Sequence, residues 1–151
     1  MESKGALRGN FTARIDDKGR LKLPNAFRSL IEEQHGSDVF VTSVTGESVR
    51  IYSMPVWMAL EERLARMPAN HPARLKFLER VNYFGQMAEF DNQGRVLLHA
   101  RLRDSAGMTG EVAVLGSSDY LDVWNHERLI AKLQREPFTD DDARALSEFG
   151  I

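Results

Sequence analysis

Apolar and polar residues alternate in two short runs near the start of the chain. Phe11, Ala13 and Ile15 alternate with polar neighbours, and the alternation resumes at Leu21 and Leu23. A period of two indicates strands with one face toward a core, and the glycine in the intervening Asp-Lys-Gly suits a tight turn. The pattern predicts a β-hairpin.

The same pattern returns 75 residues later, which indicates an internal duplication. Within residues 11–24, five positions are identical at this constant offset: Ala13/Ala88, Asp16/Asp91, Gly19/Gly94, Arg20/Arg95 and Leu23/Leu98. We therefore expect two structurally equivalent copies within one chain.

Helical periodicity and end signals place helices after each hairpin and around the copies. Asn25 and Gly36 are expected to cap a short helix, and two strands then follow at 39–42 and 49–52, with counterparts at 112–115 and 121–124. Further helices are expected from Ser53 to Pro68, from Pro72, after Asn125 and after Thr139, where Asp142 completes a capping pattern. The predicted fold is mainly β with helices, in the α+β class. Its expected parts are repeat 1 (10–56), a helical connector (57–84), repeat 2 (85–128) and a C-terminal helical tail (129–151).

Composition describes a folded protein of one ordinary domain or two small ones. The 151 residues include 42% hydrophobic and 28% charged residues and no cysteine, which excludes disulfides and thiolate metal sites. No apolar run approaches the length of a membrane span, and the first ten residues lack the apolar centre of a signal peptide. We expect a cytoplasmic protein that does not associate with a membrane.

Catalytic motifs are lacking in the sequence. The histidines have no metal-ligand spacing, and no nucleophile elbow, phosphate loop or dinucleotide fingerprint occurs. The triple Asp140 to Asp142 fits the positive end of a helix better than a metal cluster. We expect no enzyme activity, no metal and no cofactor. The histidines are His35, His71, His99 and His126.

Charge is distributed unevenly although the net charge is only −2. Residues 1–28 carry a local +4 and residues 136–151 a local −4. The bases of the first segment are Lys4, Arg8, Arg14, Lys18, Arg20, Lys22 and Arg28. The outward face of the first hairpin would show Thr12, Arg14, Arg20 and Lys22, with Lys18 at the tip. A basic two-stranded ribbon fits the DNA major groove, although outward sheet faces are commonly polar in any case.

The second copy acts as an internal control for that face. Its equivalent outward residues are Met87, Glu89, Arg95 and Leu97, with Gln93 at the tip. The fold therefore does not itself require a basic surface. Both copies keep an Asp-x-x-x-Arg spacing, Asp16/Arg20 and Asp91/Arg95, in which the aspartate can bind turn amides and the arginine. We interpret this pair as architecture, and a DNA contact by Arg20 stays open.

Longer segments of the chain form a recognisable combination. They are Arg8-Gly9-Asn10, Ile15 to Pro24, Arg50-Ile51-Tyr52, Asp91 to Leu97, Ala106-Gly107-Met108 and Val123-Trp124. Together they resemble the MraZ family of bacterial transcriptional regulators over roughly Leu7 to Phe149. This resemblance implies two pseudo-symmetric AbrB-like halves that form a swapped-hairpin β-barrel, and assembly of protomers into rings. It also implies nucleoid-associated repression through direct repeats upstream of the protein's own operon for cell division and cell-wall synthesis.

Two features depart from the family pattern. Residues Glu2 to Ala6 precede the usual start, with Leu7 where an aromatic residue is common. His99 replaces a usual proline, so we expect a less rigid exit from the second hairpin.

Two functions follow as hypotheses. The first is a sequence-specific regulator whose DNA contacts are Arg8, Arg14, Lys18, Arg20 and Lys22. The second is a ring-forming interaction scaffold, without sequence-specific DNA binding, whose basic face binds an acidic partner such as the Asp140 to Asp142 segment of a neighbouring copy.

Overall fold

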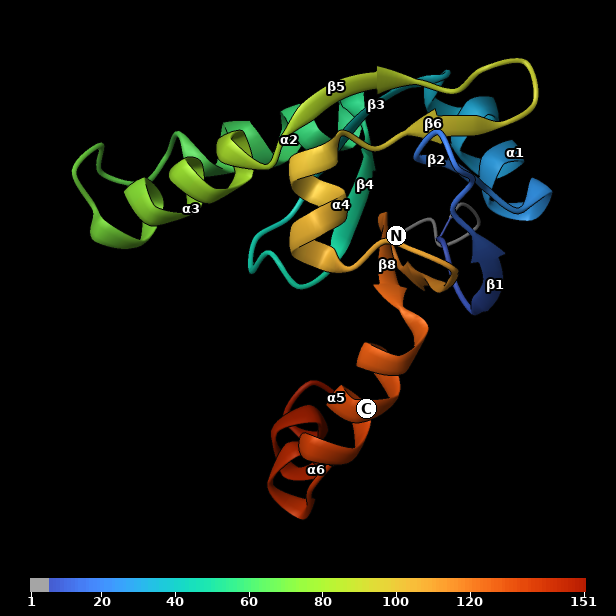
Figure 1. Cartoon of the computed structure of the whole chain (residues 1–151). Coiled ribbons are helices and arrows are strands. Elements are labelled where there is room, and N and C mark those ends of the chain that lie inside the picture. The colour runs from blue at the N-terminus through green and yellow to red at the C-terminus, as the bar shows by residue number, and fades with distance from the viewer. Residues whose placement is uncertain (1–5) are drawn as a thin grey trace.

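The computed structural model describes residues 6–151, so the N-terminal expectations on Lys4 and on residues 2–5 lie outside the described residues. Figure 1 shows strands and helices alternating along the chain. The strands are β1 (Asn10–Arg14), β2 (Arg20–Lys22), β3 (Asp38–Thr42), β4 (Val49–Ser53), β5 (Gln86–Glu89), β6 (Arg95–Leu97), β7 (Glu111–Ser117) and β8 (Tyr120–Asn125). The helices are α1 (Asn25–His35), α2 (Met54–Leu64), α3 (Pro72–Tyr83), α4 (Ala100–Ala106), α5 (His126–Arg135) and α6 (Asp140–Ser147).

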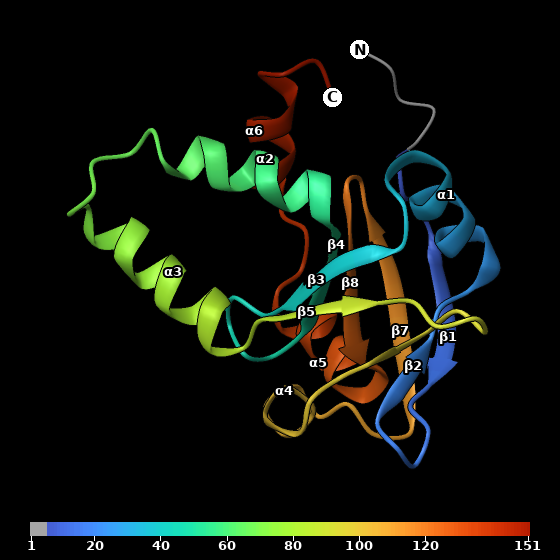
Figure 2. The ribbon, with the colours of Figure 1, turned by 90° about the horizontal axis from the view of Figure 1, so that it is seen from above.

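The strands form a six-stranded sheet and a separate two-stranded ribbon. The order in the sheet is β1-β7-β8-β4-β3-β5, and β2 pairs with β6. Every pairing is antiparallel. Viewed from above, the sheet strands lie beside one another in this order (Figure 2). The α+β class is confirmed, whereas the hydrogen bonds do not close these strands into a single barrel.

The strands of the expected local hairpin exchange partners between the copies. Only the Ile15 to Leu21 bridge next to the turn joins the two strands directly. Beyond it, β1 pairs with β7 and β2 with β6. The simple hairpin was therefore wrong as a pairing scheme, and the swapped arrangement implied by the resemblance is correct. Strands of three to five residues bury little apolar surface as an isolated pair, and exchange lets both copies close one core.

A pseudo-two-fold relation connects the two halves. The β1–β7 pairing has its counterpart in β5–β3, and the β3–β4 pairing in β7–β8. The β2–β6 and β4–β8 pairs each join a strand to its own counterpart in the other copy, so the pseudo-two-fold axis passes through both pairs. Leu21 lies opposite Val96 in the first pair, and Arg50 lies opposite Asp122 in the second. The predicted pseudo-symmetric halves are thus confirmed.

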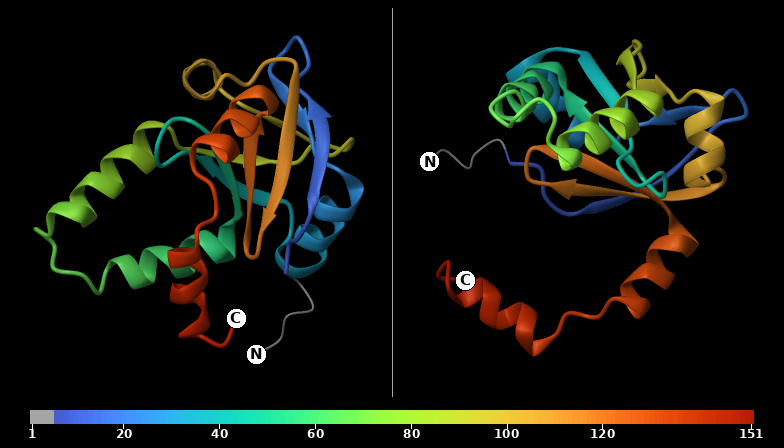
Figure 3. Two further views of the ribbon diagram at one scale, coloured as in Figure 1. Left: turned by 90° about the horizontal axis from the view of Figure 1, so that it is seen from below. Right: turned by 90° about the vertical axis from the view of Figure 1, so that its left-hand side faces the viewer.

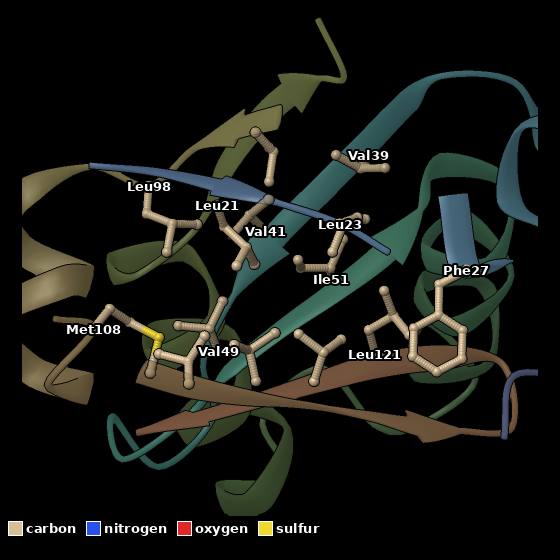
Figure 4. Close-up of a cluster of buried hydrophobic side chains, with 14 of the residues drawn as sticks. Leu21, Leu23, Phe27, Val39, Val41, Val49, Ile51, Leu98, Met108 and Leu121 are labelled. Atoms are coloured by element: carbon tan, nitrogen blue, oxygen red, sulfur yellow. The ribbon is translucent and has the colours of Figure 1, made fainter. Parts of the chain in front are cut away.

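The core lies between the sheet and the ribbon and draws on both copies. Leu21, Leu23, Val39, Ile51 and Leu98 are all less than 2% exposed, and Figure 4 shows such side chains converging from strands far apart in sequence. The face of β1 that was expected to point toward the core is only partly covered. Phe11 is 39% exposed and meets Phe27 edge-on, with ring centroids 5.0 Å apart.

Helix ends agree with most of the sequence signals. Asn125 accepts a hydrogen bond from Arg128 N, and Thr139 and Asp142 form a reciprocal capping box. Asn25 does not cap α1. It is the first helical residue, Pro24 occupies the N-cap position, and no side chain bonds there, because a proline ring already presets the backbone angle at a helix start.

His99 fixes the exit of the second hairpin instead of loosening it. Its backbone N–H donates to Gln86 Oε1 at 2.9 Å, and its Nδ1 accepts from Leu102 N at 3.3 Å at the start of α4. Its Nε2 lies 3.1 Å from Phe84 O, so the ring is held on both sides. Hydrogen bonds thus replace the rigidity that proline would have supplied. At the other departure, Leu7 is buried and its backbone pairs with Ser118.

Two helical segments extend away from this body. The α2–α3 arm projects to one side in Figures 1 and 2, and α5 leads from β8 to α6 (Figure 3). Phe40, Trp57 and Phe77 anchor the arm by stacking, with Trp57 centroids 4.6 Å from Phe40 and 6.4 Å from Phe77. None of the helices described in residues 6–151 is long and apolar enough to cross a membrane.

Candidate nucleic-acid interface

An aspartate organises each of the two glycine turns. Asp16 Oδ1 accepts from the backbone N–H of Lys18 at 3.0 Å and of Arg20 at 2.8 Å, while Oδ2 accepts from Arg20 Nε at 2.7 Å. Asp91 repeats all three bonds with Gln93 and Arg95, at 2.9, 2.9 and 2.8 Å. The turn is therefore preformed in both copies.

The same bonds hold both carboxylates in the charged form. The Arg20 backbone N–H is the main cause of the lowered pKa of Asp16. In the second copy the Arg95 backbone N–H, aided by the Arg95 side chain, lowers the pKa of Asp91 to about 2. Each arginine uses Nε for this contact, and a guanidinium has four further N–H donors besides Nε.

The β2–β6 ribbon carries an outward face built from both copies. Leu21 and Val96 point inward and are fully buried, so the outward positions are Arg20, Lys22, Arg95 and Leu97. Lys22 lies opposite Arg95 in the register. The basic ribbon expected from one hairpin is thus formed instead by two, and the second copy contributes Arg95.

Arg14 and Lys22 both line an open groove of roughly 450 Å³ beside the ribbon. Both residues are exposed, and they come from β1 and β2, which have different pairing partners. The groove is lined by Phe11, Thr12, Ala13, Arg14, Lys22, Leu23, Pro24 and Asn25. Two cations above a partly apolar floor suit a phosphate that approaches from solvent. Glu111 lies opposite Arg14 in the sheet register and reduces the local positive potential.

Two further arginines beside the turns were missed from the sequence. Arg103 of α4 packs over Gly19, and Arg28 of α1 packs over Gly94, so each copy's helix covers the other copy's turn. Both glycines have positive φ, +83° and +75°, which favours glycine at these positions. The 75-residue offset also relates Arg28 to Arg103, and this was the signal that could have identified the pair.

The proposed contact residues do not form a single cluster. Lys18 lies in the first turn and is exposed, next to Arg20 and Lys22 of the ribbon. Arg8 precedes β1 and runs beside Gly116, at the end of the strand opposite Arg14. Arg8 and Arg14 are six residue steps apart, which corresponds to at most about 20 Å of extended chain. The structure therefore brings together Arg14, Lys18, Arg20 and Lys22, and leaves Arg8 apart.

Metal ligands do not gather in the described part of the chain. Across residues 6–151, no group of three or more histidine, aspartate or glutamate side chains could hold an ion. The Asp140 to Asp142 triple belongs instead to the first turn of α6, where Asp142 completes the capping box.

Comparison with known proteins agrees with this architecture. The model of the family described as "MraZ protein, putative antitoxin-like" matches residues 6–80 and 86–149. The chain belongs to the MraZ family. The first matched segment ends within α3 and the second begins at the start of β5, so each segment contains the strands of one pseudo-symmetric half.

Relatives in this family extend over nearly the whole chain. The chain is 50% identical over 145 residues to a protein of Acidobacterium capsulatum, covering 96% of this chain and 99% of the relative. It is 46% identical over 146 residues to one of Koribacter versatilis, with the same coverage, and 34% identical over 126 residues to one of Thermomicrobium roseum, covering 83% and 86%. All three are named transcriptional regulator MraZ. Membership in the MraZ family supports transcription regulation as the function of the chain.

Proposed function

We propose that the chain is a sequence-specific DNA-binding regulator, acting as a repressor of its own operon for cell division and cell-wall synthesis. In this proposal it works in the cytoplasm on the nucleoid, without catalysis or a cofactor. Several protomers in a ring would present the first-copy face to successive direct repeats in double-stranded DNA. The relatives' shared name supports regulation of transcription, and the operon, repeats and ring are expectations from the family resemblance.

The observation that carries DNA binding is the β2–β6 ribbon with its adjoining groove. A two-stranded ribbon has the width of the major groove. Its outward face holds Arg20, Lys22 and Arg95 on a backbone fixed by the Asp16 and Asp91 turns. Arginine on a rigid strand can bind guanine edges or phosphates in a bidentate manner. Lys18 and Arg14 flank this face and are suited to phosphate contacts.

Affinity should depend on several protomers acting together. Arg14, Lys18, Arg20 and Lys22 of one protomer can neutralise only a few phosphates, each adding about 0.9 to the slope of log affinity against log salt. Linked protomers convert later contacts into intramolecular ones, which raises affinity without new chemistry. A ring that reads spaced repeats would exploit this.

The direct test is fluorescence anisotropy of the purified protein with duplex from upstream of its own gene, against a scrambled duplex, at two salt concentrations. We expect a preference for the upstream duplex that survives the higher salt. Equal binding to both duplexes that disappears at the higher salt would contradict sequence-specific regulation. It would favour the second candidate, the interaction scaffold.

Charge reversal separates these two functions more sharply if Arg20 is left in place. A glutamate at position 20 would put a second carboxylate against Asp16 and disturb the turn. The Arg14→Glu, Lys22→Glu variant changes two exposed residues outside that hydrogen-bond network. Loss of DNA binding with an unchanged assembly mass supports the regulator, whereas loss of assembly supports the scaffold. Met58→Asp, an exposed change on α2, is the matched control.

A further inference from the structure

Helix α6 has no tertiary packing within its own chain. All of its residues are exposed, and none is buried. The right-hand view of Figure 3 shows the segment after α5 extending away from the body and from the α2–α3 arm. An isolated helix of eight residues is marginal in water even with a good cap, because helix formation needs a longer run or a packing surface. The helix therefore needs a surface to dock on.

The tail also exposes large apolar side chains around this helix. Phe149 is 80% exposed and Ile151 is 79% exposed, values typical of residues with no packing partner. Large apolar residues exposed in this way are common at interaction surfaces. The exposed large apolar residues of the tail, called here the apolar tail residues, are Leu133, Phe138, Leu146, Phe149 and Ile151.

The tail is acidic where the helix begins. Asp140, Asp141 and Asp142 occupy its first turn, and Glu148 follows the last. Asp141 is paired with Arg144, and Asp142 is used in the capping box. A partner for this segment should therefore combine positive charge with aromatic or apolar surface.

One outer face of α3 has those properties. Lys76, Arg80 and Tyr83 are spaced four and three residues apart and so share a face of the helix. Arg101 of α4 extends this face. Its guanidinium lies 4.5 Å from the Tyr83 ring centroid, and its Nη1 donates to Tyr83 O at 3.2 Å. All four residues are exposed, and we call them the basic stripe.

We propose that the C-terminal tail of one copy docks on the basic stripe of a second copy. The acidic first turn of α6 would face Lys76 and Arg80, and apolar tail residues on and after α6 would pack against Tyr83. Such a contact is head-to-tail, because the two surfaces differ, and head-to-tail contacts close into rings when the rotation permits. This proposal rests on the proposed function in one respect, because the docking contact would join the protomers of the proposed ring. The contact itself can be tested without DNA.

The first experiment measures assembly mass by sedimentation velocity and native mass spectrometry. We expect the wild type to form a multi-subunit species and the Leu146→Asp, Phe149→Asp variant to need at least about tenfold more protein to assemble. Because neither side chain is buried in its own chain, thermal melting of the protomer should stay unchanged. Met58→Asp, an equally polar change at another exposed apolar residue, should assemble normally. A monomeric wild type, or a tail variant that assembles like the wild type, would overturn the proposal.

The second experiment tests the partner surface by charge exchange. Lys76→Glu with Arg80→Glu should weaken assembly, and adding Asp140→Lys with Asp141→Lys should restore it in part, since each side then carries the other's charge. If the stripe variant weakens DNA binding and leaves assembly intact, the stripe is a DNA contact and the proposal fails.

DNA binding by the same variants distinguishes the failure of this proposal from failure of the proposed function. A tail variant that cannot assemble should keep its affinity for a duplex with one repeat and lose the added affinity for several repeats. If the wild type does not discriminate its own upstream DNA, the proposed function fails, while the assembly masses still decide whether the tail docks on the stripe.

Discussion

The two glycine turns have the same internal geometry and opposite surfaces. In each turn an aspartate accepts the same three hydrogen bonds, two from the arginine and one from the backbone N–H of the residue before the glycine. The glycine of each turn has a positive φ. The outward residues then diverge, from Arg14, Lys18 and Lys22 in the first copy to Glu89, Gln93 and Leu97 in the second.

The partner strands increase this difference. Arg14 lies opposite Glu111, whereas Glu89 lies opposite Asp38, so the second edge of the sheet brings two acids together. The fold therefore requires the turn residues and tolerates either charge around them. The basic residues of the first copy are a surface property superimposed on a shared scaffold, and this is the main reason to assign DNA binding to that copy.

The largest effects should come from the core positions that both copies share. Leu23 and Leu98 are equivalent and almost fully buried, so Leu23→Ala and Leu98→Ala should each lower the free energy of unfolding by about 2–5 kcal/mol. Urea denaturation checks this, with the exposed Leu97→Ala as a control of small effect. A large loss at only one of the two buried positions would break the energetic equivalence of the halves.

Replacing the outward residues of the first copy by those of the second copy should remove DNA binding while the protein stays folded. The Arg14→Glu, Lys18→Gln, Lys22→Leu variant gives the first copy the residues that the second copy already carries on the same geometry. We expect at least about a hundredfold weaker binding and a salt slope lower by about 0.9 for each lost phosphate contact. Anisotropy titrations at several salt concentrations measure both values, and circular dichroism confirms folding. Unchanged affinity would place the DNA contacts elsewhere.

Acid should reveal the turn carboxylates. The pKa of Asp91 lies at about 2, below its ordinary 3.8, so its stabilising effect is complete above that ordinary value and is lost as the pH falls from about 4 toward 2. At neutral pH the wild type should have a higher melting temperature than the Asp91→Asn variant. The difference between the two melting temperatures should shrink as the pH falls from about 4 toward 2. Melting curves from pH 7 to 2 measure it, with Asp119→Asn as a control outside the turns. A pH-independent difference would argue against a charged turn.

The smallest effect should come from the acid that faces Arg14. Glu111→Gln removes a carboxylate opposite Arg14, one oxygen of which lies 3.2 Å from His126 Nδ1. We expect DNA binding to become about twofold tighter at low salt and to return to the wild-type value at high salt, because exposed charges are screened. Glu89→Gln at the second-copy edge should change nothing, and equal gains in both variants would remove the distinction between the copies.

Much of this protein is determined by local sequence. Local patterns predict the elements and their order, because the alternation in 11–23 and the caps at Asn125 and Thr139 depend on neighbouring residues. The duplication could be predicted because two segments 75 residues apart have similar sequences. The Asp-x-x-x-Arg spacing is also local, because the aspartate bonds to amides only two and four residues away.

Beyond the swapped arrangement that the family resemblance implies, only the tertiary structure decided which strands pair and which cations lie together. Alternation specifies that a strand has an apolar face but not the strand that lies beside it, and the exchange of β1 and β2 with β7 and β6 follows from closing one core with both copies. That exchange places Arg95 opposite Lys22, sets Arg103 and Arg28 over the partner turns and leaves Arg8 at the far end of β1. Such contacts depend on packing between residues about 75 positions apart, which no local pattern encodes.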